Sequence, residues 1–290
     1  MSTILVFGAS GVIGEFLLPR LVARGERVLA VSRTAAARAH AAEKVEWLRG
    51  DLCAAMPALP QADIVLSLGP LDAFAAWVAR ATPAQVRRVV AISSMSAESK
   101  RDSVDAAERE LSARLRAAET LLMQSARERG AECTILRPTL IYGTGRDRSL
   151  APIARFARRW RVLPVPYGAS GLRQPVHAAD LAAACLAAST SESTSGKVYQ
   201  VGGGERLRFD ALLARIAAGP PRLAWPLPLP LMLVRAGARL LRGRVSTGAL
   251  ARLTEPLVAD NAAAARDFGY APRAFRAQDV LGSADSTGAD

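Results

Sequence analysis

Three glycines near the start of the chain, Gly8, Gly11 and Gly14, constrain its fold more than any other feature. They follow an apolar run at 3–7 and precede an amphipathic stretch at 15–24. A buried strand, a glycine turn and a helix in this order are typical of a dinucleotide-binding turn, because glycine lets the backbone turn sharply and approach a pyrophosphate. The helix N-terminus adds free N–H donors and the positive end of its dipole. In this segment we expect cofactor contacts from Gly8, Ser10, Gly11, Val12, Ile13 and Gly14.

Further short apolar runs follow at 27–31, 45–48, 64–68, 89–92 and 133–136. Helical stretches separate several of them, which predicts an α/β fold with a Rossmann-type, doubly wound parallel sheet. The clearest predicted helix covers 105–130. Its apolar positions recur every three or four residues and form one stripe: Leu111, Leu115, Ala118 and Leu122.

The pattern changes after residue 143, where long basic segments with prolines begin. Only the stretches 176–189 and 197–201 resemble the earlier rhythm. We therefore expect a dinucleotide-binding domain, a small C-terminal substrate lobe and a disordered tail. Their predicted ranges are 1–143 with 174–203, 144–173 with 204–281, and 282–290.

The composition excludes several classes of protein. The 290 residues are 50% hydrophobic and 22% charged, as in an ordinary globular protein, so disorder throughout, collagen and a disulfide mini-protein are excluded. The three cysteines lack metal-ligand spacing, which predicts a reducing compartment and no metal site. Since the chain shows no signal segment before the glycine turn, we expect a cytoplasmic protein.

The net charge of +12 is concentrated in two segments, 137–173 and 220–252, which are rich in arginine and almost free of acids. An anionic substrate pocket, solvated arginines and peripheral membrane contact all remain open. The membrane interpretation depends on the apolar segment 223–234, which is too short and too proline-rich to span a bilayer, and on the arginines after it. These are Arg235, Arg239, Arg242 and Arg244. Nucleic acid is not an expected partner, because aromatic residues are few and no binding motif is present.

Six motifs in order carry a resemblance to a known family. Gly8–Gly14 is followed by Gly50-Asp51-Leu52, Ile92-Ser93-Ser94, Leu136-Arg137-Pro138 with Tyr142-Gly143, Val176-His177 with Asp180, and Tyr199-Gln-Val-Gly-Gly203. This series resembles the extended short-chain dehydrogenase/reductase family, also called the NAD-dependent epimerase/dehydratase family. The resemblance implies an adenine contact at Asp51, an active-site hydroxyl at Ser94 and a structural role for His177. It also implies that the turn after 64–68 lies near the nicotinamide.

The end of the second strand indicates which nicotinamide cofactor binds. An acidic residue there would bind the ribose 2′-hydroxyl of NAD, but this chain has Ser32 and Arg33. A hydroxyl and a guanidinium suit a 2′-phosphate, so we predict NADP(H) over NAD(H), with NAD(H) still open. The remaining expected cofactor contacts are Asp51, Leu52, Leu68, Gly69, Ser93 and Pro138.

The family resemblance also implies a catalytic tyrosine and lysine four residues apart on one helix. Glu119 matches the glutamate that follows them in the family, which puts Leu111 and Leu115 at the two catalytic positions. Neither leucine transfers a proton. The substitutes in this chain, Tyr142 with Arg146 and Ser112 with Arg116, are poor matches, and Ser94 is the remaining catalytic candidate.

Two functions are therefore open. One is a reductase, epimerase or dehydratase acting on an anionic, nucleotide-sugar-like or carbonyl substrate. The other is a non-catalytic NAD(P)-binding redox sensor or assembly scaffold. The sequence leaves a homodimer open as well.

Overall fold

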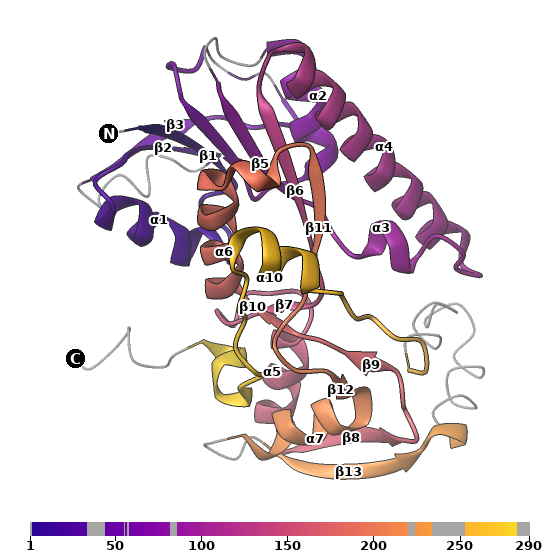
Figure 1. Cartoon of the computed structure of the whole chain (residues 1–290). Helices are drawn as coiled ribbons and strands as arrows, with labels where there is room; N and C mark the ends of the chain where they lie inside the picture. Colours follow the sequence, from indigo (N-terminus) through magenta and orange to yellow (C-terminus); the bar gives the residue numbers. More distant parts are fainter. Residues whose placement is uncertain are drawn as a thin grey trace, which may run out of the picture.

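A sheet of seven parallel strands forms the centre of the protein (Figure 1). The computed structural model describes residues 2–33, 44–54, 56, 58–81, 86–219, 224–233 and 253–282. The strand order is β11-β6-β5-β4-β1-β2-β3. The strands are β1 (Thr3–Phe7), β2 (Arg27–Ser32), β3 (Val45–Arg49), β4 (Ile64–Ser67), β5 (Arg88–Ile92), β6 (Glu132–Pro138) and β11 (Lys197–Val201). The order reverses between β1 and β4, where such sheets bind ligands at the carboxyl ends of the strands.

Helices cover both faces of the sheet, as the alternating pattern predicted. On one face, α1 (Gly14–Ala23) packs against α6 (Ala178–Thr190) over the first hydrophobic core. On the other face, α2 (Leu71–Ala81) packs against α4 (Ala106–Glu128) over the second core. Successive strand residues alternate between the two cores, since side chains on a strand point to opposite faces. The predicted doubly wound α/β fold is confirmed.

Helix α4 has a clear N-terminal cap. The Asp105 carboxylate accepts the Ala107 N–H at 3.0 Å, which satisfies one of the free donors of the first turn. Ala118, Leu122 and Ala126 are buried in the second core and Leu115 packs at its edge. The predicted stripe therefore faces the sheet, and the helix stays within the predicted range of 105–130.

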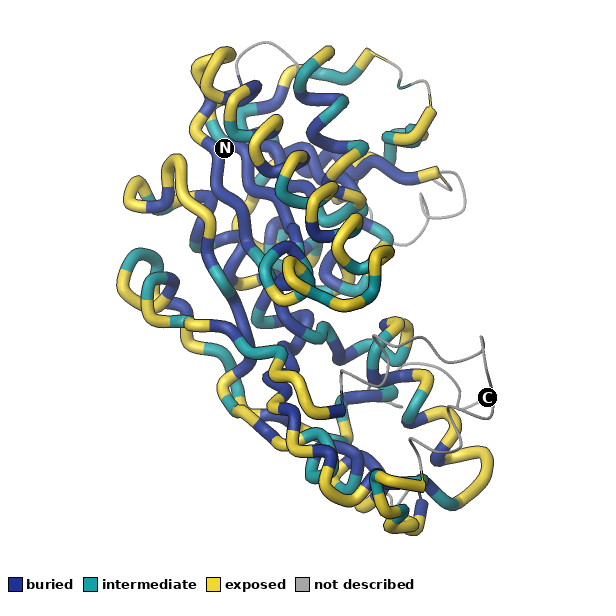
Figure 2. The backbone as a smooth tube through the Cα atoms, turned by 90° about the vertical axis from the view of Figure 1, so that its right-hand side faces the viewer, coloured by how far each residue is buried: buried dark blue, intermediate teal, exposed yellow. Residues whose placement is uncertain are grey.

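The lobe has a third core of its own (Figure 2). Two helices, α5 (Ala151–Trp160) and α7 (Phe209–Ala218), pack on a ribbon of two parallel strands, β8 (Val162–Tyr167) and β13 (Trp225–Pro230). Smaller elements complete the chain: α3 (Ser96–Ser99), β7 (Ile141–Tyr142), β9 (Leu172–Arg173), β10 (Val176–His177), η2 (Glu192–Thr194), β12 (Leu207–Arg208) and η3 (Ala277–Leu281). Strand β7 pairs with β10, and β9 pairs with β12.

One segment differs from the expected division of the chain. Helix α10 (Ala262–Phe268) falls in the range expected for the lobe, but it packs against α6 and β11. Ala264 and Tyr270 are buried in the first core, beside the sheet. The tail 283–290 and the segment 234–252, with the four arginines named above, lie outside the described residues.

Candidate functional site

The glycine turn after β1 has the geometry that its sequence predicts. Gly8 has a φ of +69°, in the left-handed region, and a Cβ there would lie 2.8 Å from the backbone of Leu68 and Gly69. A Cβ at Gly14 would lie 1.9 Å from the Ala9 carbonyl oxygen. Both positions therefore require glycine, Gly8 for the turn itself and Gly14 for the close packing of α1 on the turn.

The second glycine of the turn leaves the approach to α1 open. Gly11 is exposed, and a Cβ there would meet only the Gly8 carbonyl oxygen, at 3.1 Å. The Gly11 N–H donates to that same oxygen at 2.9 Å, which holds the turn closed. The N–H groups of Glu15, Phe16 and Leu17 already donate to the Gly11 and Ile13 carbonyls, so an anion at the start of α1 would be bound by the N–H groups that precede them. Ile13 is buried in the first hydrophobic core.

A cavity of about 210 Å³ lies beside the turn, at the carboxyl ends of β1, β2 and β3. It is lined by Phe7, Gly8, Ser10, Val31, Ser32, Arg33, Gly50, Asp51, Leu52, Cys53 and Pro70. The structure thus brings together residues from three separate motifs that the sequence linked only by family order. Five of the lining residues were not among the predicted cofactor contacts: Phe7, Val31, Gly50, Cys53 and Pro70.

Polar groups of the cavity come from the ends of β2 and β3. Ser32 is buried, whereas Arg33 is exposed at the cavity wall. The Asp51 carboxylate accepts the Cys53 N–H at 3.0 Å and so shapes the loop after β3. The site can therefore offer the Arg33 guanidinium to a phosphate and a carboxylate oxygen of Asp51 to a donor.

The hydroxyls at the end of β5 already have partners within the protein. The Ser94 Oγ accepts the Ser96 N–H at 3.1 Å, at the start of α3. The Ser93 hydroxyl donates to the Glu119 carboxylate of α4. The Pro138 carbonyl accepts the Met95 N–H at 2.9 Å. These contacts join the segment after β5 to α4 and to the end of β6.

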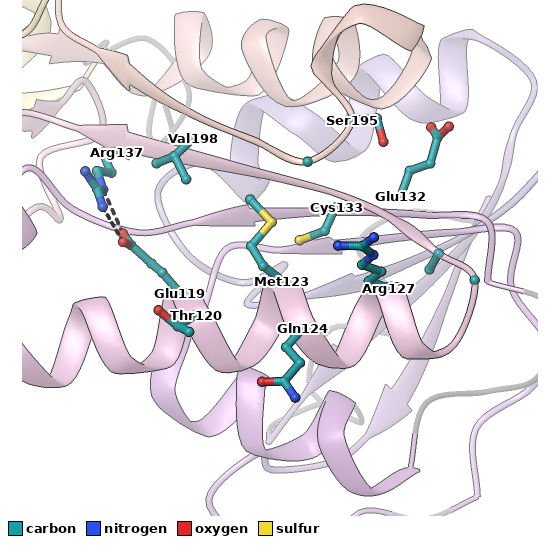
Figure 3. A pocket seen from close by; sticks show the side chains of 13 residues that line it. Glu119, Thr120, Met123, Gln124, Arg127, Glu132, Cys133, Arg137, Ser195 and Val198 are labelled. Carbon is teal, nitrogen blue, oxygen red and sulfur yellow. Dashed lines mark hydrogen bonds and ion pairs between the residues drawn. The ribbon is translucent and has the colours of Figure 1, made fainter.

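Glu119 is also the centre of a charged network (Figure 3). The Arg137 Nε donates to Glu119 at 2.9 Å, and a second nitrogen of the same guanidinium donates to the other carboxylate oxygen. Glu98 of α3 accepts a further bond from Arg137 at 2.6 Å. The hydrogen bonds to Glu119 are the main reason that the pKa of Arg137 is raised. The sequence singles out Glu119 and Arg137 separately, and no local pattern in it pairs them.

The two positions expected for catalytic residues carry partly buried leucines. Leu115 packs at the edge of the second core, and Leu111 lies one turn before it on α4. Ser112, the neighbouring alternative, is fully buried and donates to the Ala97 carbonyl at 2.7 Å. This face of α4 serves packing, and the buried Nε of Arg116 has no hydrogen-bond partner among the described residues.

Tyr142 and Arg146 do not form a pair. The Tyr142 hydroxyl is buried, accepts the Arg276 N–H at 3.2 Å, and has a pKa raised to about 12, mainly by burial. Arg146 instead forms an ion pair with Glu15 of α1.

His177 acts as the N-terminal cap of α6. Its Nδ1 accepts the Ala179 N–H at 3.1 Å, so this nitrogen carries no proton. Burial, followed by the nearby Arg273, lowers the pKa of His177. The resemblance implied a structural role for His177, and these contacts agree with that expectation.

Among the described residues, no cluster of His, Cys, Asp or Glu could hold a metal ion. Cys53, Cys133 and Cys185 are free thiols.

A family model described as NAD(P)H-binding matches residues 8–153, which is half of the chain. The chain belongs to this NAD(P)H-binding family. The matched range contains the glycine turn, the cavity and the Glu119–Arg137 pair. The cavity and the turn therefore belong to an NAD(P)-binding domain.

Two curated relatives carry the same description, NADH dehydrogenase [ubiquinone] 1 alpha subcomplex subunit 9, mitochondrial. The one from Dictyostelium discoideum is 33% identical over 87 residues, which are 30% of this chain and 24% of the relative. The one from Arabidopsis thaliana is 41% identical over 73 residues, which are 25% of this chain and 18% of the relative. The similarity thus spans no more than 24% of the length of either relative.

Solved structures of nucleotide-sugar enzymes share the fold across both domains. UDP-glucuronic acid 4-epimerase from Bacillus cereus, with UDP-glucuronic acid and NAD, has a TM-score of 0.69 at 14% identity over 96% of both chains. MoeE5 with UDP-glucuronic acid and NAD has a TM-score of 0.70 at 19% identity, again over 96% of both chains. UDP-glucose 4-epimerase from Thermotoga maritima, with UDP-glucose, has 0.69 at 15% identity with the same coverage. At these identities the likeness shows the NAD-dependent epimerase fold alone.

Proposed function

We propose that this protein binds NADP(H) without catalysing turnover, as a redox sensor or as a scaffold in the assembly of a larger complex. The observation that carries the proposal is the pair of leucines, Leu111 and Leu115, at the two positions where the family resemblance requires a tyrosine and a lysine. A reductase or epimerase must move a proton to or from a substrate oxygen in step with the hydride. Leucine offers no group that can do so.

The polar groups nearest to those positions are committed to the structure. The Ser93 hydroxyl donates to Glu119, and that carboxylate accepts the Arg137 guanidinium through two bonds. Ser94 is bonded at the start of α3, and Ser112 donates to a backbone carbonyl. Recruiting the Ser93 or the Ser112 hydroxyl as a proton donor would break a buried hydrogen bond, which costs free energy.

The dinucleotide would lie over the glycine turn and the cavity beside it. The turn from Gly8 to Gly14 and the start of α1 would bind the pyrophosphate. Ser32 and Arg33 support NADP(H) over NAD(H), because a guanidinium forms charge-assisted bonds with a 2′-phosphate. When bound, the nicotinamide ring supplies a hydride-transfer group, and the oxidised and reduced forms differ in the charge of that ring. A protein that distinguishes the two forms reports redox state without any reaction.

The comparisons support both the proposal and a second candidate. The curated relatives are described as a subunit of NADH dehydrogenase, which favours a role in assembly. The epimerase structures extend over 96% of this chain, lobe included, which favours an enzyme for an anionic, nucleotide-sugar-like substrate. In that second candidate Ser94 would be the hydroxyl nearest the reaction, and a carbonyl compound is the other substrate class to test.

One two-step experiment distinguishes the candidates. Calorimetric titration with NADPH, NADP⁺ and NADH measures cofactor affinity. The nicotinamide absorbance is then followed with UDP-sugars, aldehydes and ketones, and UDP-sugar epimerisation is followed by chromatography. We expect tight NADPH binding and no conversion of any compound. Conversion that Ser94→Ala abolishes would overturn the non-catalytic proposal, and the absence of nucleotide binding would overturn both candidates.

A further inference from the structure

The ribbon at the far end of the lobe has one face made entirely of apolar residues. In the parallel register, Trp225 lies beside Val162, Leu227 beside Pro164 and Leu229 beside Pro166. Because side chains alternate along a strand, these residues share one face. Leu163 and Val165 occupy the opposite face and are buried in the lobe core. We call the first set the outer face: Val162, Pro164, Pro166, Trp225, Leu227 and Leu229.

The exposed part of the outer face is formed by β13, because Pro166 is buried and Val162 and Pro164 are partly buried. Trp225 is 65% exposed and Leu227 is 46% exposed. At the other end of the ribbon from Trp225, Tyr167 is 73% exposed on the face opposite to the outer face, and beyond the ribbon Met232 is 80% exposed and Leu233 is also exposed. Isolated apolar side chains are common on protein surfaces, but a connected patch marks an interaction site. Tryptophan and tyrosine are enriched where proteins meet the interfacial layer of a membrane.

The prolines of β13 argue against a partner strand as the occupant. The Trp225 N–H donates to the Arg161 carbonyl at 2.9 Å. In a parallel pair, every second residue bonds to the same neighbour, so Pro226, Pro228 and Pro230 face the free edge of β13. Proline has no N–H, so this edge offers no donors to an added strand. Neither a second copy nor another protein can extend the ribbon there by regular pairing.

Exposed cations lie beside the aromatic end of the outer face. Arg155, Arg158 and Arg159 are exposed on α5, and Arg161 follows at its end, bonded through its carbonyl to Trp225. The Arg159 guanidinium lies 5.8 Å from the centre of the Trp160 ring, which is exposed too. The described segments 150–173 and 224–233 contain no Asp or Glu. These two segments therefore combine aromatic, aliphatic and cationic groups without acids, and an acid that lies next to them in the lobe is Asp210 of α7, beside Ala169.

We propose that the lobe docks on the surface of an anionic lipid bilayer. The outer face and the exposed aromatics enter the headgroup layer, and the arginines around Trp160 contact the lipid phosphates. Apolar burial and attraction to anionic lipids act together in such peripheral binding. No helix among the described residues is long and apolar enough to cross a membrane. The contact uses neither the dinucleotide cavity nor the positions of Leu111 and Leu115, so it does not depend on the proposed function.

Vesicle flotation of the full chain tests the proposal. The probes are vesicles of phosphatidylcholine alone and vesicles of phosphatidylcholine with phosphatidylglycerol, at low and high salt. We expect binding only to the anionic vesicles and its loss at high salt. The double variants Trp225→Ser/Leu227→Ser and Arg158→Glu/Arg159→Glu should each weaken binding by about tenfold or more.

Two control variants match these changes elsewhere on the surface. Val104→Ser/Leu121→Ser removes exposed apolar side chains from the other domain, and Arg24→Glu/Arg101→Glu reverses two exposed charges there. Both should float like the unaltered protein, and all variants should keep its thermal unfolding temperature. The proposal is overturned by absence of flotation, by equal binding to neutral vesicles, or by lobe and control variants behaving alike. It is equally overturned if the outer face proves to be a contact between copies, seen as a dimer that Trp225→Ser/Leu227→Ser dissociates without any vesicle binding.

Discussion

Glu119 of α4 and Arg137 of β6 form a two-point ion pair, 18 residues apart in sequence and largely removed from solvent. Each partner has a further contact, Glu119 with Ser93 and Arg137 with Glu98. The pair thus ties α4 to two strands and to α3. Glu119 lies on the same helix as Leu111 and Leu115. The polar groups next to these two leucines therefore stabilise the fold.

Breaking this pair is expected to destabilise the fold. Glu119→Ala should lower the free energy of unfolding by about 3 kcal/mol, because it leaves the Arg137 guanidinium buried with one carboxylate instead of two. Chemical denaturation measures the change. Asp72→Ala is the matched control, since it breaks the exposed Arg114–Asp72 pair and should cost less than about 1 kcal/mol. Equal losses in the two variants would show that the buried pair has no special role.

The sequence predicts most of the fold because its signals are local. Residues three or four apart determine the stripe that buries Leu122, and one short segment contains the whole turn from Gly8 to Gly14. The pairing of Glu119 with Arg137 has no local signal, since it depends on how far α4 lies from β6 in space. The return of α10 to the sheet has none either, because Ala264 and Tyr270 belong to a short apolar segment that would suit either domain.

The candidate site, like the fold, has parts that the sequence predicts and parts that it does not. Family order predicts that Gly8, Ser32 and Asp51 meet at one end of the sheet, and the cavity contains all three. Five residues of its lining were not predicted as contacts, and their side chains carry no binding signature: Phe7, Val31, Gly50, Cys53 and Pro70. The sequence also locates Ser94 at the end of a strand but cannot show that its Oγ already bonds a backbone N–H, because that depends on the local path of the chain into α3.

Arg33 is expected to determine the choice of cofactor. Arg33→Ala should weaken NADPH binding by about tenfold or more, through loss of a charge-assisted bond to the 2′-phosphate, and should leave NADH binding unchanged. Calorimetric dissociation constants for both nucleotides measure the effect. Arg24→Ala, at the opposite end of α1, is the control and should alter neither constant. An equal loss for both nucleotides in Arg33→Ala would contradict the assignment of this residue to the 2′-phosphate.

His177 is expected to make stability depend on pH. Its pKa in the fold lies below its ordinary value of about 6.5, so below that pH the unfolded chain binds more protons than the folded one. The stabilisation that His177 gives to the fold is therefore complete above about pH 6.5. It is lost as the pH falls through the pKa of His177 in the folded protein, because protonation of Nδ1 removes the cap on α6.

The free energy of unfolding, measured from neutral pH to about pH 5, checks this effect. His177→Asn keeps a capping acceptor without a titrating ring, so in this variant the free energy of unfolding should fall less as the pH is lowered. Asp279→Asn should steepen it, because Asp279 favours the charged form of His177 and opposes the lowering of its pKa. Identical slopes in the unaltered protein and in His177→Asn would rule out His177 as the titrating group.

Substitutions of Gly11 and of Gly14 are expected to affect different properties, cofactor affinity in the first case and stability in the second. Gly11→Ala places a methyl group where the pyrophosphate approaches, and its nearest contact in the protein, at 3.1 Å, needs only a small adjustment. It should weaken NADPH binding by about tenfold or more with less than about 1 kcal/mol of lost stability. Gly14→Ala puts a methyl group 1.9 Å from the Ala9 carbonyl oxygen, so α1 must move. It should cost about 3 kcal/mol of stability.

Denaturation and calorimetry on the same two variants separate these effects. Gly25→Ala is the control for backbone strain alone: its φ is +73° and no atom lies within 4 Å of the added carbon. It should cost about 1 kcal/mol and leave NADPH affinity unchanged, because it lies at the far end of α1 from the turn. If Gly11→Ala kept full affinity, the pyrophosphate would not lie over the turn, and the assignment of the cavity to the dinucleotide would fail with it.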